Sequence, residues 1–416
     1  MSELNYWVWL SQCFSPGSDK PNQLLADFDS PEEFYTRGLS ELDGIEYLTD
    51  VERSKIQRTS LERADFILSE CKRLGIQVLT LESASYPKHL KSIFSAPLVL
   101  YVKGSLEGLD EVPLITVVGT REASDYGKRL TGNICFELAR AGMVVVSGCA
   151  VGIDSYAHLG ALKGAGRTIS VLGCGLDVNY PSAHRELKEQ IVKKGGALVS
   201  ELPPGTEVTP SIFPIRNRIM AGMSLGTLVT EAPERSGSLI TAQHALEQGR
   251  DIFCVPPADL YSTAYSGVIR YLRDGATPVF CAKDVVLEYL SAYPQTIDVS
   301  KLLDSYAGMS GQSSASKAGK KAPEKRTVQT APQKKEQASA APQEEEDISK
   351  KPATPASLDE KEKRVYTCLE FKPKVADEIA ALSGMEMKDV LAVLTALEVK
   401  GYVFSCSGSR YGLLNK

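Results

Sequence analysis

The residues of this chain best suited to chemistry are small residues and arginines that directly follow short apolar runs. Glycine lets backbone amides approach a phosphate closely, and a helix that begins behind the glycine adds a partial positive charge. Such segments predict a cradle that can hold several anions. They comprise Gly119-Thr120-Arg121, Ser147-Gly148 with Gly152-Ile153, the run from Gly173 through Gly175 to Tyr180, and Ser236-Gly237-Ser238.

Three arginines supply full positive charges for this cradle, and each guanidinium can meet phosphate oxygens in bidentate fashion. Arg121 stands at a glycine-rich run end, where anion binding is favoured over a structural role. Arg216 and Arg218 lie in the segment FPIRNR, and on one helix they do not share a face. We therefore expect one of them to face a ligand and the other to pair with Glu201 or Glu231.

The sequence does not match the motifs of common nucleotide-binding enzymes. The dinucleotide fingerprint breaks because Val178 stands where the third glycine after Gly173 and Gly175 belongs, and no Gly-Lys-Ser/Thr completes a P-loop. The four histidines are dispersed, and His158, one helical turn after Asp154, suits packing or holding a loop. We expect no catalytic residue and no cofactor.

Composition and charge indicate the cellular compartment and the kind of ligand that this cradle can bind. Nine cysteines are scattered from Cys13 to Cys406 without the spacing of a zinc site, so we expect reduced thiols and no metal. A net charge of −5 means that any nucleic-acid site is a local patch. No apolar run approaches the roughly 20 residues of a membrane span, and the start lacks a basic segment. We expect a cytoplasmic protein without membrane contact.

The elements that must position the cradle are the apolar runs themselves. Seven such runs follow one another, and each is separated from the next by about the length of a helix. They are LITVVG, MVVVSG, TISVLG, ALVSEL, GTLVTEA, DIFCVP and TPVF. This alternation predicts an α/β fold with a Rossmann-like, doubly wound, mostly parallel sheet. The first helix of this region should begin after Ser124, its N-cap, and end at Gly142. Ile134 and Leu138 should form its buried stripe. In such a sheet, ligands bind outside the carboxyl ends of the strands.

The remaining chain divides into three further parts. Residues 1–85 carry helical patterns and predict a small helical, SAM-like domain before the sheet domain of residues 86–298. This small domain lacks a glycine-rich hairpin that could grip a phosphate, so a structural or protein-contact role is favoured over DNA binding. Residues 299–357 are rich in Ser, Ala, Lys, Pro, Gln and Glu and predict a disordered linker. Residues 358–416 regain helical periodicity and predict a separate domain.

The motifs together resemble those of the DprA/Smf family, in order along the chain. The similarity rests on Gly119-Thr120-Arg121, SGCAVGIDSYAH, TISVLGCGLDVNYP, SELPPG, FPIRNRIMAG and EAPERSGSLITAQHALEQGR, after the lead-in YPKHLKSIFSAPLVLYVKG. The resemblance implies a protein that binds and protects single-stranded DNA without altering it. It also implies loading of a RecA-type recombinase during DNA uptake, natural transformation and homologous recombination.

The resemblance also assigns residues to the DNA-facing pocket. These are Gly119, Thr120, Arg121, Ser147, Gly148, Gly152, Ile153, Gly173, Gly175, Tyr180, Phe213, Arg216, Asn217, Arg218, Ser236, Gly237 and Ser238. At the same end of the sheet the family pairs two subunits, which implies a homodimer with Leu246, Ile269 and Leu272 in its interface. The same three residues also fit an ordinary core position, so both readings stay open.

The C-terminal pattern of three helices and a strand pair predicts a winged helix, which resembles a module found in many members of the family. Its third helix sets Lys388 and Lys400 against Glu386, Asp389 and Glu398. Such a mixed surface does not suit a duplex groove. A protein-contact or accessory DNA role is therefore favoured over a transcription factor that reads duplex sequence.

One enzymatic alternative remains. Rossmann-like nucleotide phosphoribohydrolases cleave nucleoside monophosphates with a glycine-rich loop, an arginine and a glutamate. Here Arg216, Glu231 and the SGS loop could imitate a phosphate clamp beside a general base. The PGGxGTxxE signature of those enzymes is absent from this chain, which favours the binding protein.

Overall fold

A computed structural model describes residues 2–302, 358–369, 374–400, 402–406 and 410–413. These residues belong to two compact units, one up to residue 302 and one from residue 358. Most of the predicted linker, residues 303–357, lies outside the described residues. Its first residues include a 3-10 turn, η6 (Val299–Lys301). In the described ranges, no helix has the length and apolar character required to cross a bilayer.

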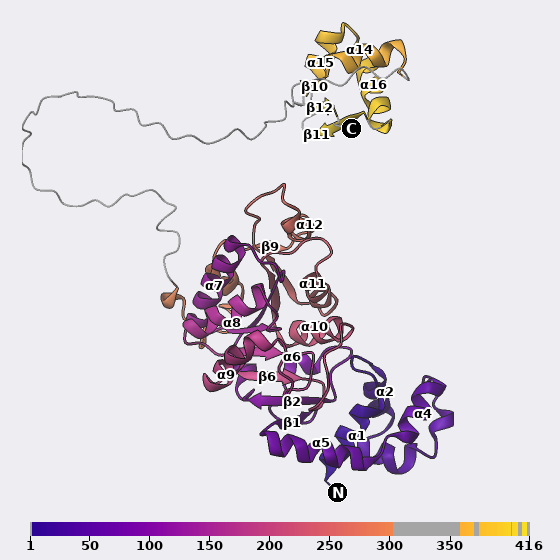
Figure 1. Ribbon diagram of the computed structural model, residues 1–416, viewed down its shortest axis with the longest axis vertical. Coiled ribbons are helices and arrows are strands. Elements are labelled where there is room, and N and C mark those ends of the chain that lie inside the picture. The colour runs from indigo at the N-terminus through magenta and orange to yellow at the C-terminus, as the bar shows by residue number, and fades with distance from the viewer. Residues whose placement is uncertain (1, 303–357, 370–373, 401, 407–409, 414–416) are drawn as a thin grey trace, which may run out of the picture. The chain divides into compact units, whose positions relative to one another are not determined.

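A nine-stranded sheet forms the centre of the first unit, with the strand order β1-β2-β6-β5-β4-β3-β7-β8-β9 (Figure 1). The strands from β6 to β9 in that order pair in parallel, and β2 pairs antiparallel with both β1 and β6. All seven apolar runs form strands, so the predicted mostly parallel, doubly wound fold is confirmed. The strands are β1 (Gln77–Thr80), β2 (Val99–Gly104), β3 (Leu114–Val118), β4 (Val144–Ser147), β5 (Thr168–Val171), β6 (Ala197–Ser200), β7 (Gly226–Val229), β8 (Asp251–Cys254) and β9 (Thr277–Pro278).

Strand β1 corrects the predicted domain boundary. It lies within residues 1–85, which the helical pattern assigned to the N-terminal domain, yet Gln77 to Thr80 pair with β2 at the edge of the sheet. A four-residue edge strand has too little local pattern to be recognised, because its pairing partner decides its state. The sheet therefore begins before residue 86.

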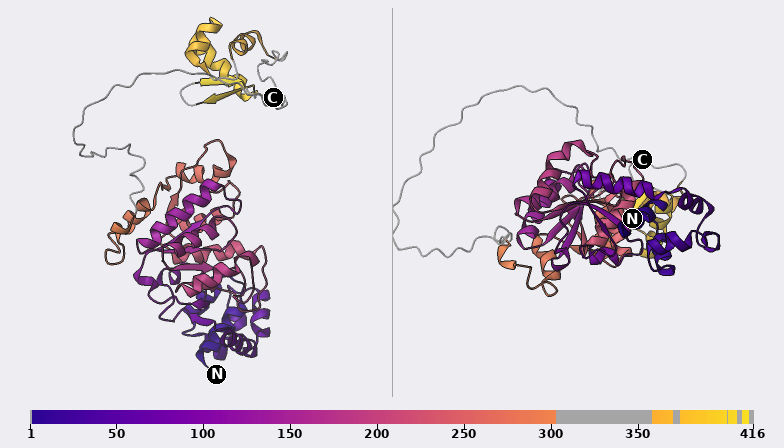
Figure 2. Two further views of the ribbon diagram at one scale, coloured as in Figure 1. Left: turned by 60° about the vertical axis from the view of Figure 1, so that its left-hand side comes forward. Right: turned by 90° about the horizontal axis from the view of Figure 1, so that it is seen from below.

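Helices cover both faces of the sheet (Figure 2). On one face α7 (Asp125–Arg140), α8 (Ile153–Lys163), α9 (Arg185–Lys193) and α13 (Ala282–Tyr289) are packed. On the other lie α6 (Lys88–Lys91), α10 (Ile212–Met223), α11 (Ser238–Glu247) and α12 (Ser266–Arg273). Single turns η3 (Leu109–Glu111), η4 (Ser182–His184) and η5 (Thr263–Tyr265) connect these elements. Ile115 and Val117 of β3 face the first layer and Val118 faces the second, as the alternation of a strand requires.

Helix α7 shows how the local signals act. The side chain of Ser124 accepts a hydrogen bond from the amide of Gly127, as its N-cap role predicted. Ile134 and Leu138 are buried on the face toward the sheet. After the helix, Gly142 has φ +96°, a conformation that few other residues adopt.

The predicted N-terminal helical region is present and packs on the sheet. It contains α1 (Glu3–Cys13), α2 (Lys20–Asp27), α3 (Pro31–Glu33), the π-turn η1 (Phe34–Gly38), η2 (Leu42–Gly44), α4 (Asp50–Arg58) and α5 (Leu61–Leu74). Its core residues Trp9 and Phe34 join one apolar cluster with Tyr101 of β2 and Leu198 of β6. The helices therefore share their core with the sheet.

The second unit is a winged helix with its own core around Val365, Ile379 and Leu394. Its helices are α14 (Glu360–Cys368), α15 (Ala376–Ser383) and α16 (Met387–Val399), and its strands are β10 (Lys374–Val375), β11 (Val403–Cys406) and β12 (Arg410–Leu413). The strand order is β10-β12-β11. The predicted winged helix is confirmed, with β10 as an additional strand.

Candidate functional site

A groove of about 980 Å³ opens where the direction of the sheet reverses. Strand β3 pairs with β4 on one side and β7 on the other, so the loops after β3 and β7 diverge to opposite faces. Ligands of doubly wound sheets bind at this switch point. A smaller adjoining cavity is formed by the loops after β4 and β5.

Most of the predicted site residues line these two cavities. They come from four loops that follow strands and from the start of α10, which lines the groove together with these loops. The lining residues predicted from the sequence are Gly119, Thr120, Arg121, Gly148, Gly173, Tyr180, Phe213, Arg216, Asn217, Ser236, Gly237 and Ser238.

The rings of Phe213 and Tyr180 lie among the cations of the groove. The guanidinium carbons of Arg121 and Arg216 are 5.3 Å and 5.9 Å from the centroid of the Phe213 ring. The centroids of Phe213 and Tyr180 are 5.9 Å apart, with their planes tilted by 36°. The buried Lys188, which lines neither cavity, supports this loop from behind, because its Nζ donates to the carbonyl oxygen of Tyr180 at 3.1 Å. The groove thus combines aromatic faces with positive charges.

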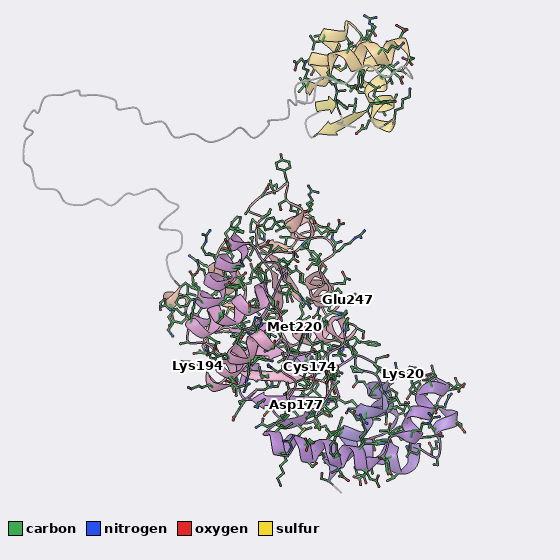
Figure 3. All side chains as sticks on the ribbon, in the orientation of Figure 1. Lys20, Cys174, Asp177, Lys194, Met220 and Glu247 are labelled. Atoms are coloured by element: carbon green, nitrogen blue, oxygen red, sulfur yellow. The ribbon has the colours of Figure 1, made fainter. Side chains whose placement is uncertain are left out.

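Arg216 is the buried cation of the site, with a relative exposure of 7 %. Its Nη1 donates to the carbonyl oxygen of Val171 and lies 3.6 Å from the sulfur of Met220, which is labelled in Figure 3. A Cβ on Gly148 would meet the guanidinium at 2.1 Å, so only glycine fits there. Nε of Arg216 has no hydrogen-bond partner within the described chain. A buried guanidinium with a free donor is suited to an anionic ligand.

Asp154 balances this charge, and the sequence reasoning did not assign it to the site. Its carboxylate accepts hydrogen bonds from the amides of Gly148 and Ala150, both at 3.2 Å. Burial raises the pKa of Asp154, whereas the charge of Arg216 acts in the opposite direction. Burial also lowers the pKa of Arg216. The signal for Asp154 was its position in the glycine-rich segment after β4.

Four predicted residues do not line either cavity and instead hold the loops in place. The hydroxyl of Ser147 is buried and donates to the carbonyl oxygen of Val117. Ile153 is fully buried in the core, and its amide donates to the carbonyl oxygen of Thr120. Gly152 has φ +89°, and a Cβ at this position would meet the carbonyl oxygen of Thr120 in the same β3 loop at 2.4 Å, so glycine is required. Gly175 lies against the backbone of the loop after β6, at Gly205.

Arg218 is the fifth predicted residue outside both cavities. Its Nη2 lies 2.6 Å from Oε1 of Glu201, and both side chains are largely buried. This ion pair agrees with the expectation that one of the two helix arginines is structural, with Glu201 as one of its two expected partners. The other arginine, Arg216, faces the groove.

The start of α11 forms the far side of the groove. Ser236, Gly237 and Ser238 line it, and the hydroxyls of the two serines lie 2.7 Å apart. The side-chain amide of Asn217 donates to the carbonyl oxygen of Gly237 at 3.2 Å and so ties α10 to this turn. A Cβ on Gly237 would meet nothing within 4 Å, so this backbone is open to a ligand.

Glu231 is not available as a general base. Its carboxylate accepts hydrogen bonds from the amide and the hydroxyl of Ser124, at 3.0 and 2.9 Å. The side chain is buried at the start of α7 and does not line the groove with Arg216. This position removes the carboxylate that the phosphoribohydrolase alternative requires.

Two histidines have structural contacts. His184 lies beside Cys149, with 3.9 Å between Nδ1 and Sγ, a pairing that the sequence did not predict. The thiol is fully buried, and burial raises its pKa to about 11, so it stays protonated and is a poor nucleophile. His158 is also fully buried, with its Nδ1 2.7 Å from the hydroxyl oxygen of Thr168.

The described residues contain no group of three or more His, Cys, Asp or Glu side chains that could hold a metal. Eight cysteines are free thiols, and all but Cys368 are buried.

The residues predicted for a dimer interface differ in exposure. Leu246 on α11 is 51 % exposed. Leu272 on α12 is partly buried and packs against the core cluster that includes Val268 and Tyr271. Ile269 is also partly buried. Of the three, Leu246 is the side chain that presents an apolar surface to solvent.

In the winged helix, the charges predicted on α16 are partly engaged. Lys400 pairs with the buried carboxylate of Glu362 at 2.6 Å. Lys361 of α14 lies 3.9 Å from Asp389. The described part of α16 therefore presents paired charges of both signs and no cluster of unpaired cations.

Comparison with known proteins identifies the family. A model described as "DNA recombination-mediator protein A" matches residues 77–290, and one described as "DprA winged helix domain" matches residues 349–409. "Protein Smf" of Synechocystis is 34 % identical over 418 residues, which cover 99 % of this chain and 98 % of that protein. "DNA processing protein DprA" of Bacillus subtilis is 40 % identical over 222 residues, or 53 % of this chain and 74 % of that protein.

A solved structure agrees with this result. The X-ray structure of DNA processing protein A from Streptococcus pneumoniae matches with a TM-score of 0.58 and 30 % identity, covering 68 % of this chain and 97 % of that one. The family model covers the whole parallel part of the sheet, and the Synechocystis relative matches almost from end to end. The chain therefore belongs to the DprA/Smf family of DNA recombination mediators.

Proposed function

We propose that this protein binds single-stranded DNA in the groove at the switch point of the sheet. The observation that carries the proposal is the grouping of Arg121 and Arg216 with the rings of Phe213 and Tyr180. Sequence-independent binding of single strands combines cations for the phosphates with aromatic faces on which bases stack. The start of α11 adds backbone amides suited to a further phosphate.

Binding without catalysis fits these contacts best. Glu231 is held by Ser124, and the Cys149 thiol is protonated and buried, so neither acts on a bound strand. The proposed roles are to protect the strand and to help load a RecA-type recombinase onto it during DNA uptake and homologous recombination. The family's description as a recombination mediator supports this proposal. Free thiols suit action in the cytoplasm.

We further propose a homodimer through the surface around Leu246. An exposed leucine in the last turn of α11 is a candidate for a contact between two copies about a two-fold axis. Two grooves on one strand would raise the apparent affinity through effective concentration, without any new contact. For the winged helix we propose a protein-contact or accessory role, because α16 carries mixed charges.

A gel-shift experiment tests the proposed DNA binding. The purified full-length chain is mixed with single-stranded and with duplex oligonucleotides of one sequence, at two salt concentrations. Stronger retardation of the single strand, weakened by salt, is the expected result. Equal retardation of the duplex, or no retardation of either, would contradict the proposal.

A further inference from the structure

A second cavity of about 1260 Å³ lies between the N-terminal helices and the segment that follows β6, in the part of the unit beside α2 and α4 in Figure 1. We call it the N-terminal cleft. One wall comes from α1, α2, α4 and the start of α5, and the other from the segment Glu201–Ile212. None of the residues assigned to DNA from the sequence lines it.

The N-terminal wall of the cleft carries three cations. Lys55, Arg58 and Arg63 are exposed side chains that line the cleft, and none of them forms a salt bridge in the described chain. Nζ of Lys55 donates to the carbonyl oxygen of Phe14 at 2.8 Å. Burial lowers the pKa of Lys55, and the charge of Arg63 lowers it further. These cations lie on one wall of the cavity, and the like charges of Lys55 and Arg63 disfavour each other, so an anion beside them would be stabilised.

The carboxylates that line the cleft leave this charge unbalanced. Glu201 is paired with Arg218 at 2.6 Å, and Asp50 with Arg53 at 3.0 Å. Glu207 is exposed on the opposite wall. Two of the three acidic side chains that line the cleft are thus paired with arginines other than Arg58 and Arg63, and Glu207 alone remains to balance the three cations.

The N-terminal cleft adjoins the groove through a single segment of chain. Thr209 and Ile212 line the cleft, whereas Val208, Pro210 and Phe213 line the groove. The segment of residues 208–213 therefore separates the groove from the N-terminal cleft, and these five side chains line one or the other cavity. A strand that leaves the groove past Phe213 enters the cleft once it has crossed this segment, and the cations lie on the opposite wall of that cleft.

We propose that the N-terminal cleft binds the phosphates of single-stranded DNA that continues out of the groove, so that the N-terminal helices extend the binding site. This inference rests on the proposed function of the groove. Lys55, Arg58 and Arg63 contact phosphates, and the apolar side chains of Leu202 and Ile212 line the path for sugars and bases. The cleft thus adds affinity for a long strand and none for a strand that fills the groove alone.

The test compares two charge-reversed pairs in the full-length chain. Arg58→Glu with Arg63→Glu changes the cleft. Lys72→Glu with Lys194→Glu, the control, makes the same change in net charge at exposed lysines that line none of the cavities described above; Lys194 is labelled in Figure 3. All four side chains are exposed, so both variants should melt close to the wild-type temperature.

Fluorescence anisotropy is measured with oligothymidines of about 4 to about 16 nucleotides, the range of site sizes of single-strand-binding OB-folds. Affinity for the longest strand should fall at least about tenfold more in the cleft variant than in the control. The slope of log Kd against log salt should fall by about 0.7 for each lost phosphate contact. Affinity for the shortest strands should match the control. Arg58→Gln with Arg63→Gln should give an intermediate loss.

Equal behaviour of the cleft variant and the control at every length would overturn the inference, even if the wild type binds well. A loss of the same size at every length would also overturn it, because the cleft would then not be a separate extension. Failure of the wild type to bind any single strand would instead refute the proposed function of the groove, and the cleft inference with it. Where the wild type binds, Arg121→Ala, which changes only the groove, is the comparison for the cleft variant, because it should weaken short and long strands alike.

Discussion

The guanidinium of Arg121 lies over the ring of Phe213, with 5.3 Å between the guanidinium carbon and the ring centroid. Arg121 follows β3 and Phe213 lies in the first turn of α10, so the contact joins segments about ninety residues apart in the chain. It places an exposed cation, suited to a phosphate, beside a ring that can stack on a base.

Replacing Arg121 with alanine should raise the Kd for single-stranded DNA about tenfold or more. A hydrogen bond to a charged group contributes about 1.5 to 3 kcal/mol, and about 1.4 kcal/mol corresponds to a tenfold change in Kd. The slope of log Kd against log salt should fall by about 0.7. Anisotropy titrations at several salt concentrations measure both effects. Arg129→Ala, which removes an exposed arginine of α7 outside the groove, is the control, and equal Kd values for the two variants would refute the assignment.

Phe213→Ala should weaken binding by a different route. Loss of stacking costs about 1 to 3 kcal/mol per base, so the Kd should rise about fivefold or more, with little change in the salt slope. Phe213→Tyr keeps an aromatic face and should bind nearly as well as the wild type. If alanine and tyrosine at this position bind equally, the ring does not stack on a base.

The buried His158 should make the protein less stable in acid. Burial lowers its pKa to about 3 from the ordinary 6.5, and Nε2 is buried without a partner among the described residues. Below about pH 6.5 the unfolded chain therefore binds a proton that the folded chain does not, and the stability present above that pH is lost progressively toward pH 3.

The matched variant is His158→Gln, whose amide can still reach the hydroxyl of Thr168 but does not titrate. The free energy of unfolding, measured with urea at a series of pH values, should fall more steeply for the wild type than for the variant between about pH 6.5 and pH 4. Parallel curves would show that His158 is not responsible.

Leu246→Arg should give a folded monomer with weaker apparent DNA binding, because the side chain is exposed and its charge would be buried in a dimer interface. Leu272→Arg should instead destabilise the fold, since Leu272 packs on the core. Light scattering and thermal melting separate these outcomes. Leu287→Arg, at a 49 % exposed leucine of α13 on the other face of the sheet, is the control. A wild type that is monomeric at micromolar concentration would refute the proposed dimer.

Local pattern was sufficient to predict much of this molecule. The seven strands from β3 to β9, the cap at Ser124 and the winged helix follow from period, composition and capping residues, which act over a few neighbours. The same locality explains why β1 was missed, since its state depends on pairing with β2. The glycine-rich segments after the strands also predicted where the groove lies, because parallel strands have their carboxyl ends at the same edge of the sheet.

Only the tertiary structure decided which side chains of those loops meet. Arg216 and Arg218 are two residues apart, yet one lies under the groove and the other pairs with Glu201. Ile153 enters the core, and Asp154 turns toward the amides of its own loop beside Arg216. These outcomes depend on distances between segments that are far apart in sequence. Residue types and spacing set what each side chain can do, whereas packing sets which partner it reaches.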